Sequence, residues 1–244
     1  MNKPAKKTNH SGPDGEQVQA MFDRIAPRYD LANTVLSFGT HHGWRKKVVK
    51  YSGARQGEKV LDVATGTGDL AFAFSRVVGR GAGSVTGVDF VPKMIELADQ
   101  KLKKRPQEGL SFQVANAMEL PFEEESFNVV SISFGIRNVE SPAKALQEFY
   151  RVLKPGGRVV VLEFGQPKVP IFSTSYRLYS KYLMPAIGSK LTGDRDAYEY
   201  LPETAEQFPC RAEFTELMAE AGFVDNRWKA VTGGIAFMYR GRKS

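Results

Sequence analysis

The sequence has very few of the residues that build disulfides and metal centres. It contains one cysteine, Cys210, and three histidines in 244 residues. A single cysteine cannot form an internal disulfide, and it suits a reducing cytoplasm, which is the location we expect. It also excludes mechanisms that need two cysteines. Because so few histidines accompany it, we expect no zinc site and no other metal.

Long apolar runs are also missing. No run reaches about 18 apolar residues, the length that indicates a membrane-spanning helix. Residues 1–16 contain Lys, Asn, Gly and Pro but lack the apolar centre of a secretory signal, so we predict a disordered tail there. The remaining residues, 17–244, are enough for a single large α/β domain with a sizeable core.

The charge balance is basic, with a net charge of +7. Such an excess is compatible with a nucleic-acid partner, an anionic membrane surface or a merely solvated surface. The basic residues are spread along the chain, which favours the solvated surface. Charge alone therefore identifies no partner.

Apolar segments alternate with helical patterns along most of the chain. We predict helices over 69–78, 92–104, 143–153 and 212–221. We predict strands over 59–65, 84–90, 111–115, 127–134, 158–164, 224–231 and 235–240. This alternation predicts a doubly wound, Rossmann-like α/β sheet of seven strands, whose antiparallel terminal strand we place at the edge. A helical lid before the first strand and a helical insertion at about 166–210 complete the domain.

A glycine turn follows the first predicted strand. Gly66 and Gly68 allow backbone N–H groups to approach a ligand without a Cβ in the way. A dinucleotide-binding turn would have a third glycine, and Ala71 stands at that position, so hydride transfer is the lesser alternative. The turn resembles the S-adenosylmethionine-binding turn of class I methyltransferases, although Ala64 replaces its usual first glycine. The alternative, that this turn only closes the βα unit and binds no ligand, remains open.

Polar residues end the second and third predicted strands. Asp89 lies about 20 residues after the glycines, where a carboxylate can accept hydrogen bonds from both hydroxyls of a ribose. The alternative role is to cap the helix that begins at Pro92. Asn116 and Ala117 stand where class I enzymes hold the adenine, although asparagine is also common in turns. Asp62 is expected to organise the glycine loop.

The fourth predicted strand lacks the signature of nitrogen methylation. Enzymes that methylate exocyclic or amide nitrogens often have Asn/Asp-Pro-Pro-Tyr there, whereas this chain has Ser-Phe-Gly-Ile-Arg-Asn over 133–138. Methylation of cytosine C5 needs a cysteine nucleophile in the sheet region, and Cys210 lies far downstream. Both reactions are therefore disfavoured.

Two longer patterns carry a resemblance to one family. Tyr-Asp-x-x-Asn-x-x-Leu-Ser-x-x-x-His-x-x-Trp over 29–44 and Arg-Val-Leu-Lys-Pro-Gly-Gly over 151–157, with Leu-Glu at 162–163, resemble signatures of the ubiquinone/menaquinone biosynthesis C-methyltransferase family. Segments 133–138 and 196–201 are also similar, and the resemblance runs from about Val18 to the C-terminus. Ala32 and Gly165 depart from the usual Met and Ser of the two signatures.

The resemblance implies a reaction and a set of contacts. A methyl group of S-adenosyl-L-methionine would pass to a ring carbon of a polyprenylated hydroquinone: demethylmenaquinol, a methoxy-benzoquinol or both. The ring carbon becomes nucleophilic when the neighbouring hydroxyl, with a pKa of about 10, loses its proton. The resemblance implies cofactor contacts at Thr67, Asp89, Asn116, Ala117 and Ser133, beside those of Asp62, Gly66 and Gly68.

Arg137 and Tyr29 are the candidate catalytic residues. Because arginine stays protonated, Arg137 would stabilise the quinolate or order a water that takes its proton. Its alternative role is a salt bridge to Glu140 or Glu163. Tyr29 would hydrogen-bond the quinol from the lid, or simply pack in the core. His41 is the sole candidate for an imidazole base, and we expect it to be structural.

The predicted insertion carries an apolar stripe beside basic residues. Tyr176, Tyr179, Leu183 and Ile187 recur at helical spacing. This stripe could line a tunnel for the isoprenoid tail, rest on an anionic membrane or face an ordinary core. We expect peripheral contact with the inner face of the membrane and no nucleic acid. A homo-oligomer, a methyltransferase of RNA or another small molecule, and a non-enzymatic binding module remain open alternatives.

Overall fold

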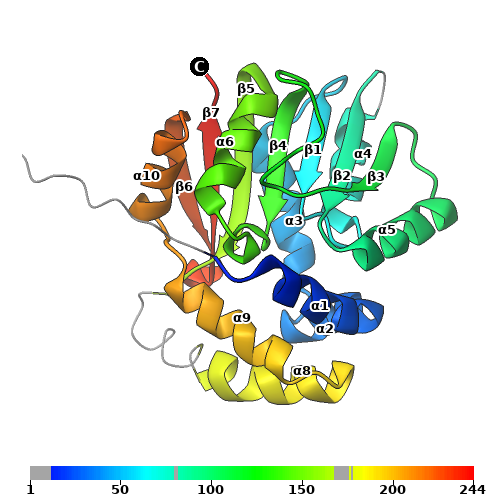
Figure 1. Ribbon diagram of the computed structural model, residues 1–244, viewed down its shortest axis with the longest axis vertical. Helices are drawn as coiled ribbons and strands as arrows, with labels where there is room; N and C mark the ends of the chain where they lie inside the picture. The colour runs from blue at the N-terminus through cyan, green and yellow to red at the C-terminus, as the bar shows by residue number, and fades with distance from the viewer. Residues whose placement is uncertain (1–11, 80–81, 168–175, 177) are drawn as a thin grey trace, which may run out of the picture.

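A seven-stranded sheet in the order β3-β2-β1-β4-β5-β7-β6 forms the centre of the computed structural model (Figure 1). The structure describes residues 12–79, 82–167, 176 and 178–244. The strands are β1 (Lys59–Val63), β2 (Ser84–Asp89), β3 (Leu110–Val114), β4 (Phe127–Ser133), β5 (Leu153–Phe164), β6 (Val224–Val231) and β7 (Ala236–Arg242). The first five are parallel, and β7 runs antiparallel to both of its neighbours.

The antiparallel strand is the terminal one, as predicted, but its place at the edge was predicted wrongly. β7 pairs with β5 on one side and β6 on the other, so β6 forms the edge. Burial explains this order. Five of the seven residues of β7 are buried, whereas β6 is mostly exposed and carries Asp225, Asn226, Arg227 and Lys229. The more apolar strand takes the inner place, and the charged strand takes the edge, where charge also discourages further pairing.

Helices cover both faces of the sheet. On one face, α3 (Thr40–Ser52) and α4 (Asp69–Val78) pack in a cluster with residues of β1, β4 and β5. On the other, α6 (Pro142–Val152) and α10 (Ala212–Glu220) pack in a second cluster. Helix α5 (Pro92–Lys104) flanks β2 and β3. Coverage of both faces explains the continuous Val and Leu run of β5.

Most predicted element bounds agree with the structure within a few residues. The largest difference is β5, which begins at Leu153 and not at Arg158. The Pro-Gly-Gly sequence at 155–157 does follow the end of α6, as predicted, but the chain enters the strand without an intervening loop.

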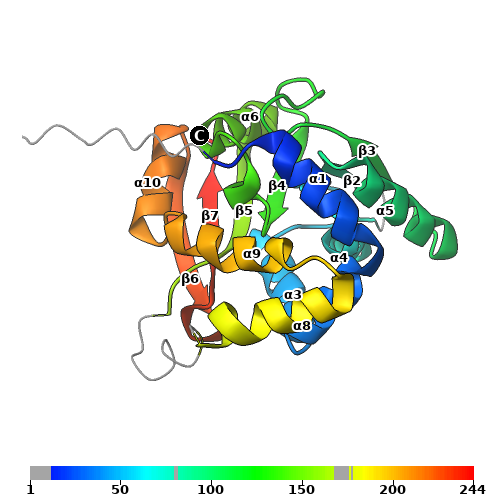
Figure 2. The same ribbon diagram turned by 60° about the horizontal axis from the view of Figure 1, so that its bottom comes forward.

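A group of helices that we call the cap lies along the carboxyl ends of the parallel strands (Figures 1 and 2). The cap consists of α1 (Gly15–Ile25), η1 (Ala26–Arg28), α2 (Tyr29–Leu36), the π-helical turn η3 (Tyr179–Leu183), α8 (Met184–Thr192) and α9 (Asp196–Gln207). A small apolar core joins Met21, Ile25 and Leu36 of its first part to Met184 and Tyr198 of its second. Two distant segments of the chain therefore form one layer.

Residues 1–11 of the predicted tail lie outside the described residues. Helix α1 begins at Gly15, inside the stretch that we predicted as tail. The side chain of Asp14 accepts hydrogen bonds from the N–H groups of Glu16 (2.8 Å) and Gln17 (3.3 Å), and so caps this helix. In the predicted insertion, residues 168–175 and 177 lie outside the described part. No helix that the structure describes has the length and apolar content to cross a bilayer.

Candidate active site

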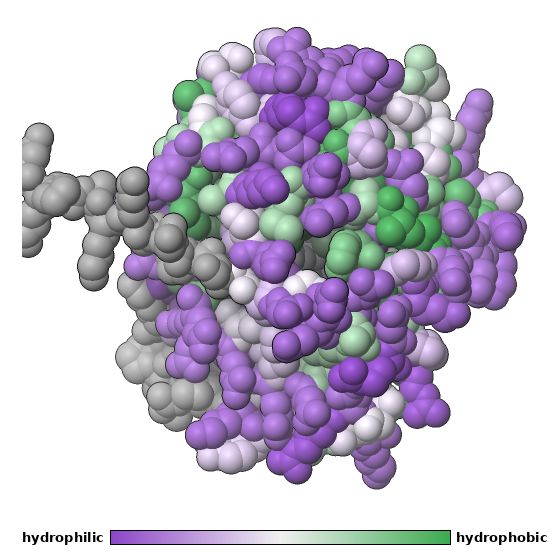
Figure 3. Space-filling view, viewed as in Figure 1, coloured by the Kyte–Doolittle hydropathy of each residue, from purple (hydrophilic) through white to green (hydrophobic). Residues whose placement is uncertain are grey.

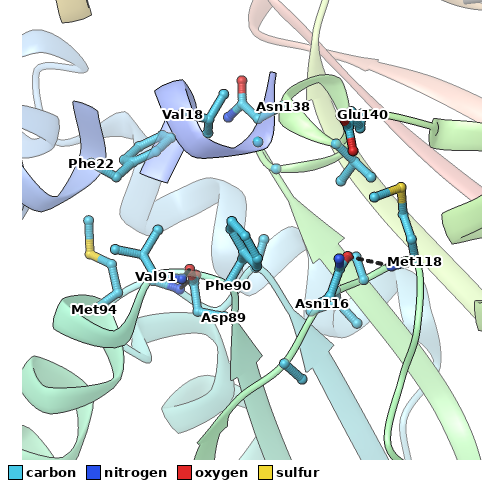
Figure 4. Close-up of a pocket in the computed structure, with 18 of the residues that line it drawn as sticks. Val18, Phe22, Asp89, Phe90, Val91, Met94, Asn116, Met118, Asn138 and Glu140 are labelled. Atoms are coloured by element: carbon cyan, nitrogen blue, oxygen red, sulfur yellow. Dashed lines mark hydrogen bonds between the residues drawn. The ribbon is translucent and has the colours of Figure 1, made fainter. Parts of the chain in front are cut away.

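Two pockets meet at the glycine turn between β1 and α4. The Asp89 pocket is lined by α1 and by the loops that follow β1 to β4, including Gly66, Asp89, Asn116 and Ala117 (Figure 4). The Arg137 pocket is lined by α2, α3, the turn and the ends of β4 and β5, including Tyr29, Thr67, Ser133 and Arg137. Ala64, Gly66 and Phe134 line both pockets. The structure therefore brings most of the predicted site residues to one edge of the sheet.

The turn that joins the pockets has left-handed backbone. Ala64, Gly66 and Gly68 have φ values of 50°, 57° and 86°. This conformation is free for glycine but costs roughly 1–2 kcal/mol for a residue with a Cβ, so Ala64 is strained where a glycine is usual. A Cβ on Gly135 would lie 2.4 Å from that of Ala64, and one on Gly68 would lie 2.6 Å from the Phe112 ring. Gly68 and Gly135 thus permit close packing around the turn.

Asp62 holds this turn from beneath. It is buried, and its carboxylate accepts hydrogen bonds from the hydroxyls of Thr65 (2.7 Å) and Ser131 (2.6 Å). Burial raises the pKa of Asp62 to about 6, although the two hydroxyls oppose this shift. Neither Asp62 nor Gly68 lines the two pockets described above. Their geometry supports the shape of the turn.

Asp89 presents a carboxylate at the end of β2. One oxygen accepts a hydrogen bond from the N–H of Gly66 (2.7 Å), and the other from that of Val91 (3.0 Å). Burial raises the pKa of Asp89 to about 6, although these N–H groups favour the ionised form. Because each oxygen can accept a second hydrogen bond, the carboxylate can still receive two hydroxyl donors from a ligand.

The far end of the Asp89 pocket suits a flat ring. Figure 4 shows Val18 and Phe22 of α1 across the pocket from Phe90, with Asn116 at one side. The Asn116 side-chain oxygen accepts a hydrogen bond from the N–H of Met118 (2.9 Å), which fixes the orientation of the amide. An apolar slot with one oriented amide matches the needs of an adenine.

Arg137 forms the ion pair that was the alternative to a catalytic role. Its Nη1 lies 2.5 Å from Oε1 of Glu163 and donates to the carbonyl of Phe134 (2.8 Å). The side chains of Arg137 and Glu163 are only 4% and 1% exposed, so the pair is buried. Its guanidinium carbon also lies 5.2 Å from the centre of the Phe164 ring. Glu163 thus fixes the guanidinium without consuming all of its donors.

Two buried polar atoms of the Arg137 pocket have no hydrogen-bond partner among the described residues. They are Nε of Arg137 and Oγ of Ser133. Buried polar groups are rarely left unpaired, because each loses its hydrogen bonds to water. A donor and a hydroxyl left free in one pocket therefore point to a ligand that carries oxygen or another polar atom.

Aromatic side chains form the wall beside these atoms. The ring centres of Trp44 and Phe134 are 5.6 Å apart, and those of Phe134 and Phe164 are 4.3 Å apart. Tyr29 also lines the pocket, and its ring lies 3.7 Å from where a Cβ on Gly66 would stand. Burial raises the pKa of Tyr29, so its hydroxyl stays protonated and can donate a hydrogen bond. The pocket can hold an aromatic ring that has oxygen substituents.

His41 lines the same pocket but is poorly suited to act as a base. It is buried, and its Nδ1 lies 2.7 Å from Oγ of Ser37. Burial, reinforced by the charge of Arg45, lowers the pKa of His41 to about 4. The imidazole is therefore neutral near pH 7, with little affinity for a proton.

Several site residues were missed in the sequence. Trp44 and Phe164 form the wall of the Arg137 pocket, and Leu201 of α9 reaches it from the cap. Val18 and Phe22 close the Asp89 pocket. Their position depends on how the cap docks on the sheet, and no local pattern encodes that docking. The matched segments 29–44 and 196–201 did mark these regions, but not the residues that face the site.

The fold and the site together define a class of enzyme. A crystal structure of a SAM-dependent methyltransferase from Aquifex aeolicus has a TM-score of 0.61 with this chain at 20% identity, and the match covers 82% of this chain and 89% of that one. That likeness shows the fold. With a glycine turn after β1 and a carboxylate after β2, the protein is a class I methyltransferase that uses S-adenosylmethionine.

The family follows from closer relatives. The model of the ubiE/COQ5 methyltransferase family matches residues 10–243, and the chain belongs to this family. It is 50% identical to the ubiquinone/menaquinone biosynthesis C-methyltransferase UbiE of Bdellovibrio bacteriovorus, over 96% of this chain and 98% of that protein. It is 44% identical to a demethylmenaquinone methyltransferase of Staphylococcus aureus, over 93% of each chain. The resemblance found in the sequence is confirmed.

Proposed function

We propose that the protein transfers a methyl group from S-adenosylmethionine to a ring carbon of a polyprenylated hydroquinone. The reaction would convert demethylmenaquinol to menaquinol, a methoxy-benzoquinol to its methylated product, or both. The names of the two relatives support this choice of acceptor. The observation that carries it is the pair of unpartnered polar atoms, Arg137 Nε and Ser133 Oγ, beside an aromatic wall.

The Asp89 pocket supplies the contacts to the methyl donor. Asp89 accepts hydrogen bonds from the ribose hydroxyls, and Asn116 with Ala117 holds the adenine. Gly66 and Gly68 shape the turn that faces the amino-acid end of the donor, with Asp62 beneath it, while Thr67 and Ser133 complete the site. The bound donor supplies a methyl group on a positively charged sulfur, which a carbon nucleophile can attack. The protein must then align the acceptor and raise its nucleophilicity.

Arg137 activates the acceptor in this proposal. Its free Nε–H donates to a quinol oxygen and favours the ionised form of that oxygen, because a cation at hydrogen-bond distance lowers the pKa of a phenol. Negative charge on the oxygen makes the neighbouring ring carbon nucleophilic. Tyr29, which stays protonated, donates a hydrogen bond to the quinol from the other side. A water that Arg137 orders takes the proton of the quinol hydroxyl. After the methyl group has passed from sulfur to the ring carbon, that carbon loses its proton to water, the quinol oxygen takes one up and aromaticity is restored, so one proton is released overall.

The quinone content of cells tests this function. In cells that lack the protein, mass spectrometry should show a demethylated quinone in place of the mature one. The wild-type gene should restore the normal profile, and a gene that encodes an Asp89→Ala variant should not. An unchanged quinone profile in cells lacking the protein would refute the proposed acceptor.

The exposed side of the cap supports peripheral contact with a membrane. Apolar side chains in or next to α2 and η3 are exposed: Leu31, Val35, Phe38, Leu178, Tyr182 and Leu183, with Phe38 exposed by 79%. The two groups adjoin, because the rings of Phe38 and Tyr179 lie 5.8 Å apart. Of the predicted stripe, Tyr179 and Ile187 instead pack on the core of the cap.

The charge around this apolar face suits anionic lipid. Residues 31–57 and 178–193 contain no aspartate or glutamate. None of Lys46, Lys47, Lys181 and Lys190 forms an ion pair with a carboxylate in the described part of the chain. Exposed apolar side chains in segments that carry lysines and no carboxylates are typical of peripheral membrane binding. Such contact would let a polyprenyl tail stay in the bilayer during the reaction.

Co-sedimentation with vesicles tests this contact. We expect the protein to pellet with vesicles that contain anionic lipid and to stay in solution with neutral ones. Phe38→Ser with Tyr182→Ser should abolish pelleting. Val114→Ser, an equivalent change on an exposed residue of β3, should not. Recovery of the wild-type protein in the supernatant with anionic vesicles would contradict the proposal.

A further inference from the structure

One ammonium group joins the cap to the glycine turn. Nζ of Lys101, on α5, lies 2.6 Å from Oδ2 of Asp30 on α2 and 2.8 Å from Oδ1 of Asp69 on α4. It also donates to the hydroxyl of Thr67 in the turn (2.7 Å). The Thr67 hydroxyl in turn donates to Oδ1 of Asp30 (2.6 Å). We call these four residues the latch.

The hydrogen bonds of the latch are chemically consistent. A hydroxyl has one proton to give and lone pairs to accept, and Thr67 gives its proton to Asp30 while it accepts from Lys101. The ammonium also keeps two carboxylates, Asp30 and Asp69, close to one hydroxyl without repulsion. Burial raises the pKa of Asp69, but the charges of Arg45 and Lys101 outweigh it and hold that pKa below its ordinary value. Lys101 is thus the group on which the arrangement depends.

The latch lies directly beside Tyr29. Tyr29 and Asp30 are the first two residues of α2, and no side-chain hydrogen bond caps this helix. Asp30 anchors the first turn of the helix to Thr67 instead. Tyr29 then packs over Gly66, whose N–H binds Asp89. The position of the cap, the shape of the turn and the Asp89 carboxylate are therefore linked through consecutive contacts.

We propose that Asp30 and Lys101 are positioning residues that hold the cap closed on the turn and thereby strengthen binding of the methyl donor. They touch no reacting atom and act through Tyr29 and Thr67. The proposal rests on the proposed function in one respect, the assignment of the donor to the Asp89 pocket. Because Lys101, Asp30 and Asp69 are 29%, 41% and 31% exposed, salt should weaken the latch.

Calorimetry of donor binding tests the proposal without any methyl acceptor. For Lys101→Met and Asp30→Asn, we expect the Kd of S-adenosylmethionine to rise about fivefold to tenfold, the range of a partly exposed polar network. The double variant should bind no more weakly than the weaker single variant. Thr67→Val should show a similar loss, and Thr67→Ser, which keeps the hydroxyl, should restore most of the affinity.

A matched control lies on the same helix. Lys93 of α5 forms an exposed ion pair with Glu96, and Lys93→Met removes the same charge away from the latch. This variant should bind the donor as the wild type does. In the wild type the Kd of S-adenosylmethionine should rise from low to high salt. In Lys101→Met it should rise less, because the ion pairs that salt would weaken are already absent. Equal affinities for Lys101→Met and Lys93→Met would overturn the proposal.

Hydrogen exchange without any ligand tests the latch independently of the proposal that the Asp89 pocket binds the donor. Amides of α2 should exchange about tenfold faster in Lys101→Met than in the wild type or Lys93→Met, because the helix loses its anchor. If exchange is faster in Lys101→Met but the wild-type protein binds no S-adenosylmethionine, the proposed function is refuted and the latch is supported. Unchanged exchange of α2 would refute the latch itself.

Discussion

The two pockets that meet at the glycine turn are built in different ways. In the Asp89 pocket, backbone N–H groups of Gly66 and Val91 hold the carboxylate, and the lining comes mainly from loops that follow successive parallel strands. In the Arg137 pocket, an opposite charge, Glu163, holds the guanidinium, and much of the lining comes from α2, α3 and α9. The first is part of the sheet architecture. The second forms only where distant segments meet, and two of its buried polar atoms, Arg137 Nε and Ser133 Oγ, have no hydrogen-bond partner among the described residues.

Of the variants proposed here, Asp89→Ala should have the largest effect, and it should affect the Asp89 pocket alone. This change removes the proposed acceptor for the ribose hydroxyls, and hydrogen bonds to a charged group contribute about 1.5–3 kcal/mol each. The Kd of S-adenosylmethionine should therefore rise at least about a hundredfold by calorimetry. Circular dichroism should confirm folding. If a change at Arg137 weakened donor binding equally, the division of roles between the pockets would be wrong.

A smaller effect, on the reaction itself, is expected at Arg137. Removal of one member of a buried ion pair leaves the other charged and costs about 3–5 kcal/mol of stability. The informative variant therefore combines Arg137→Met with Glu163→Gln. Its kcat should fall about a hundredfold, in line with the loss of one preorganised donor, while the Kd of the donor stays within about twofold. Glu163→Gln alone retains the cation but leaves it unpaired, so circular dichroism must first confirm that this variant folds; the folded variant should lose less activity than the double variant.

Binding of the donor in the Asp89 pocket should also depend on pH. Burial raises the pKa of Asp89 to about 6. In the proposed complex the ionised carboxylate accepts the hydrogen bonds of the ribose. Affinity should thus be constant above about pH 7 and about tenfold weaker at pH 5. The free energy of unfolding should change with pH in the opposite direction. Because the pKa values of Asp89 and Asp62 are raised in the folded protein, both residues add stability as the pH falls from about 6 towards 4. In Asp89→Asn, the affinity should be low and nearly independent of pH in this range.

The smallest expected effect concerns the strain in the shared turn. Ala64→Gly places glycine where φ is 50°, so the free energy of unfolding should rise by about 0.5–1 kcal/mol. Ala71→Gly, inside α4, should lower it by about 1 kcal/mol. Thermal unfolding measures both. A loss of stability in Ala64→Gly would show that the left-handed Ala64 is not strained.

The same difference between the pockets explains what the sequence could predict. Gly66, Asp89 and Asn116 follow successive strands, and parallel strands bring their carboxyl ends to one edge, so spacing along the chain predicts proximity in space. Trp44 and Phe164 could not be located in this way, because their meeting depends on how α3 docks on the sheet. The free Nε of Arg137 also required the structure, since the sequence offered an ion pair and a catalytic role as alternatives.

The sheet order shows a similar limit. Alternating strands and helices predicted seven strands and an antiparallel terminal strand, and both are present. β7 lies between β5 and the edge strand β6. This order depends on which of the two last strands is better buried, and local sequence patterns do not show that. Asp30 and Lys101 were missed for the same reason, since α2, the turn and α5 come together only in the folded chain.

The position of the transferred methyl group tests the proposed reaction most directly. The purified protein would be incubated with S-adenosylmethionine that carries a ¹³C-labelled methyl group and with a reduced demethylmenaquinol, and the product would be analysed by NMR. We expect the label on a ring carbon, as an aromatic methyl signal, and little product from the Arg137→Met/Glu163→Gln variant. Label on a quinol oxygen, or no transfer to any quinol by the wild-type protein, would contradict the proposed reaction.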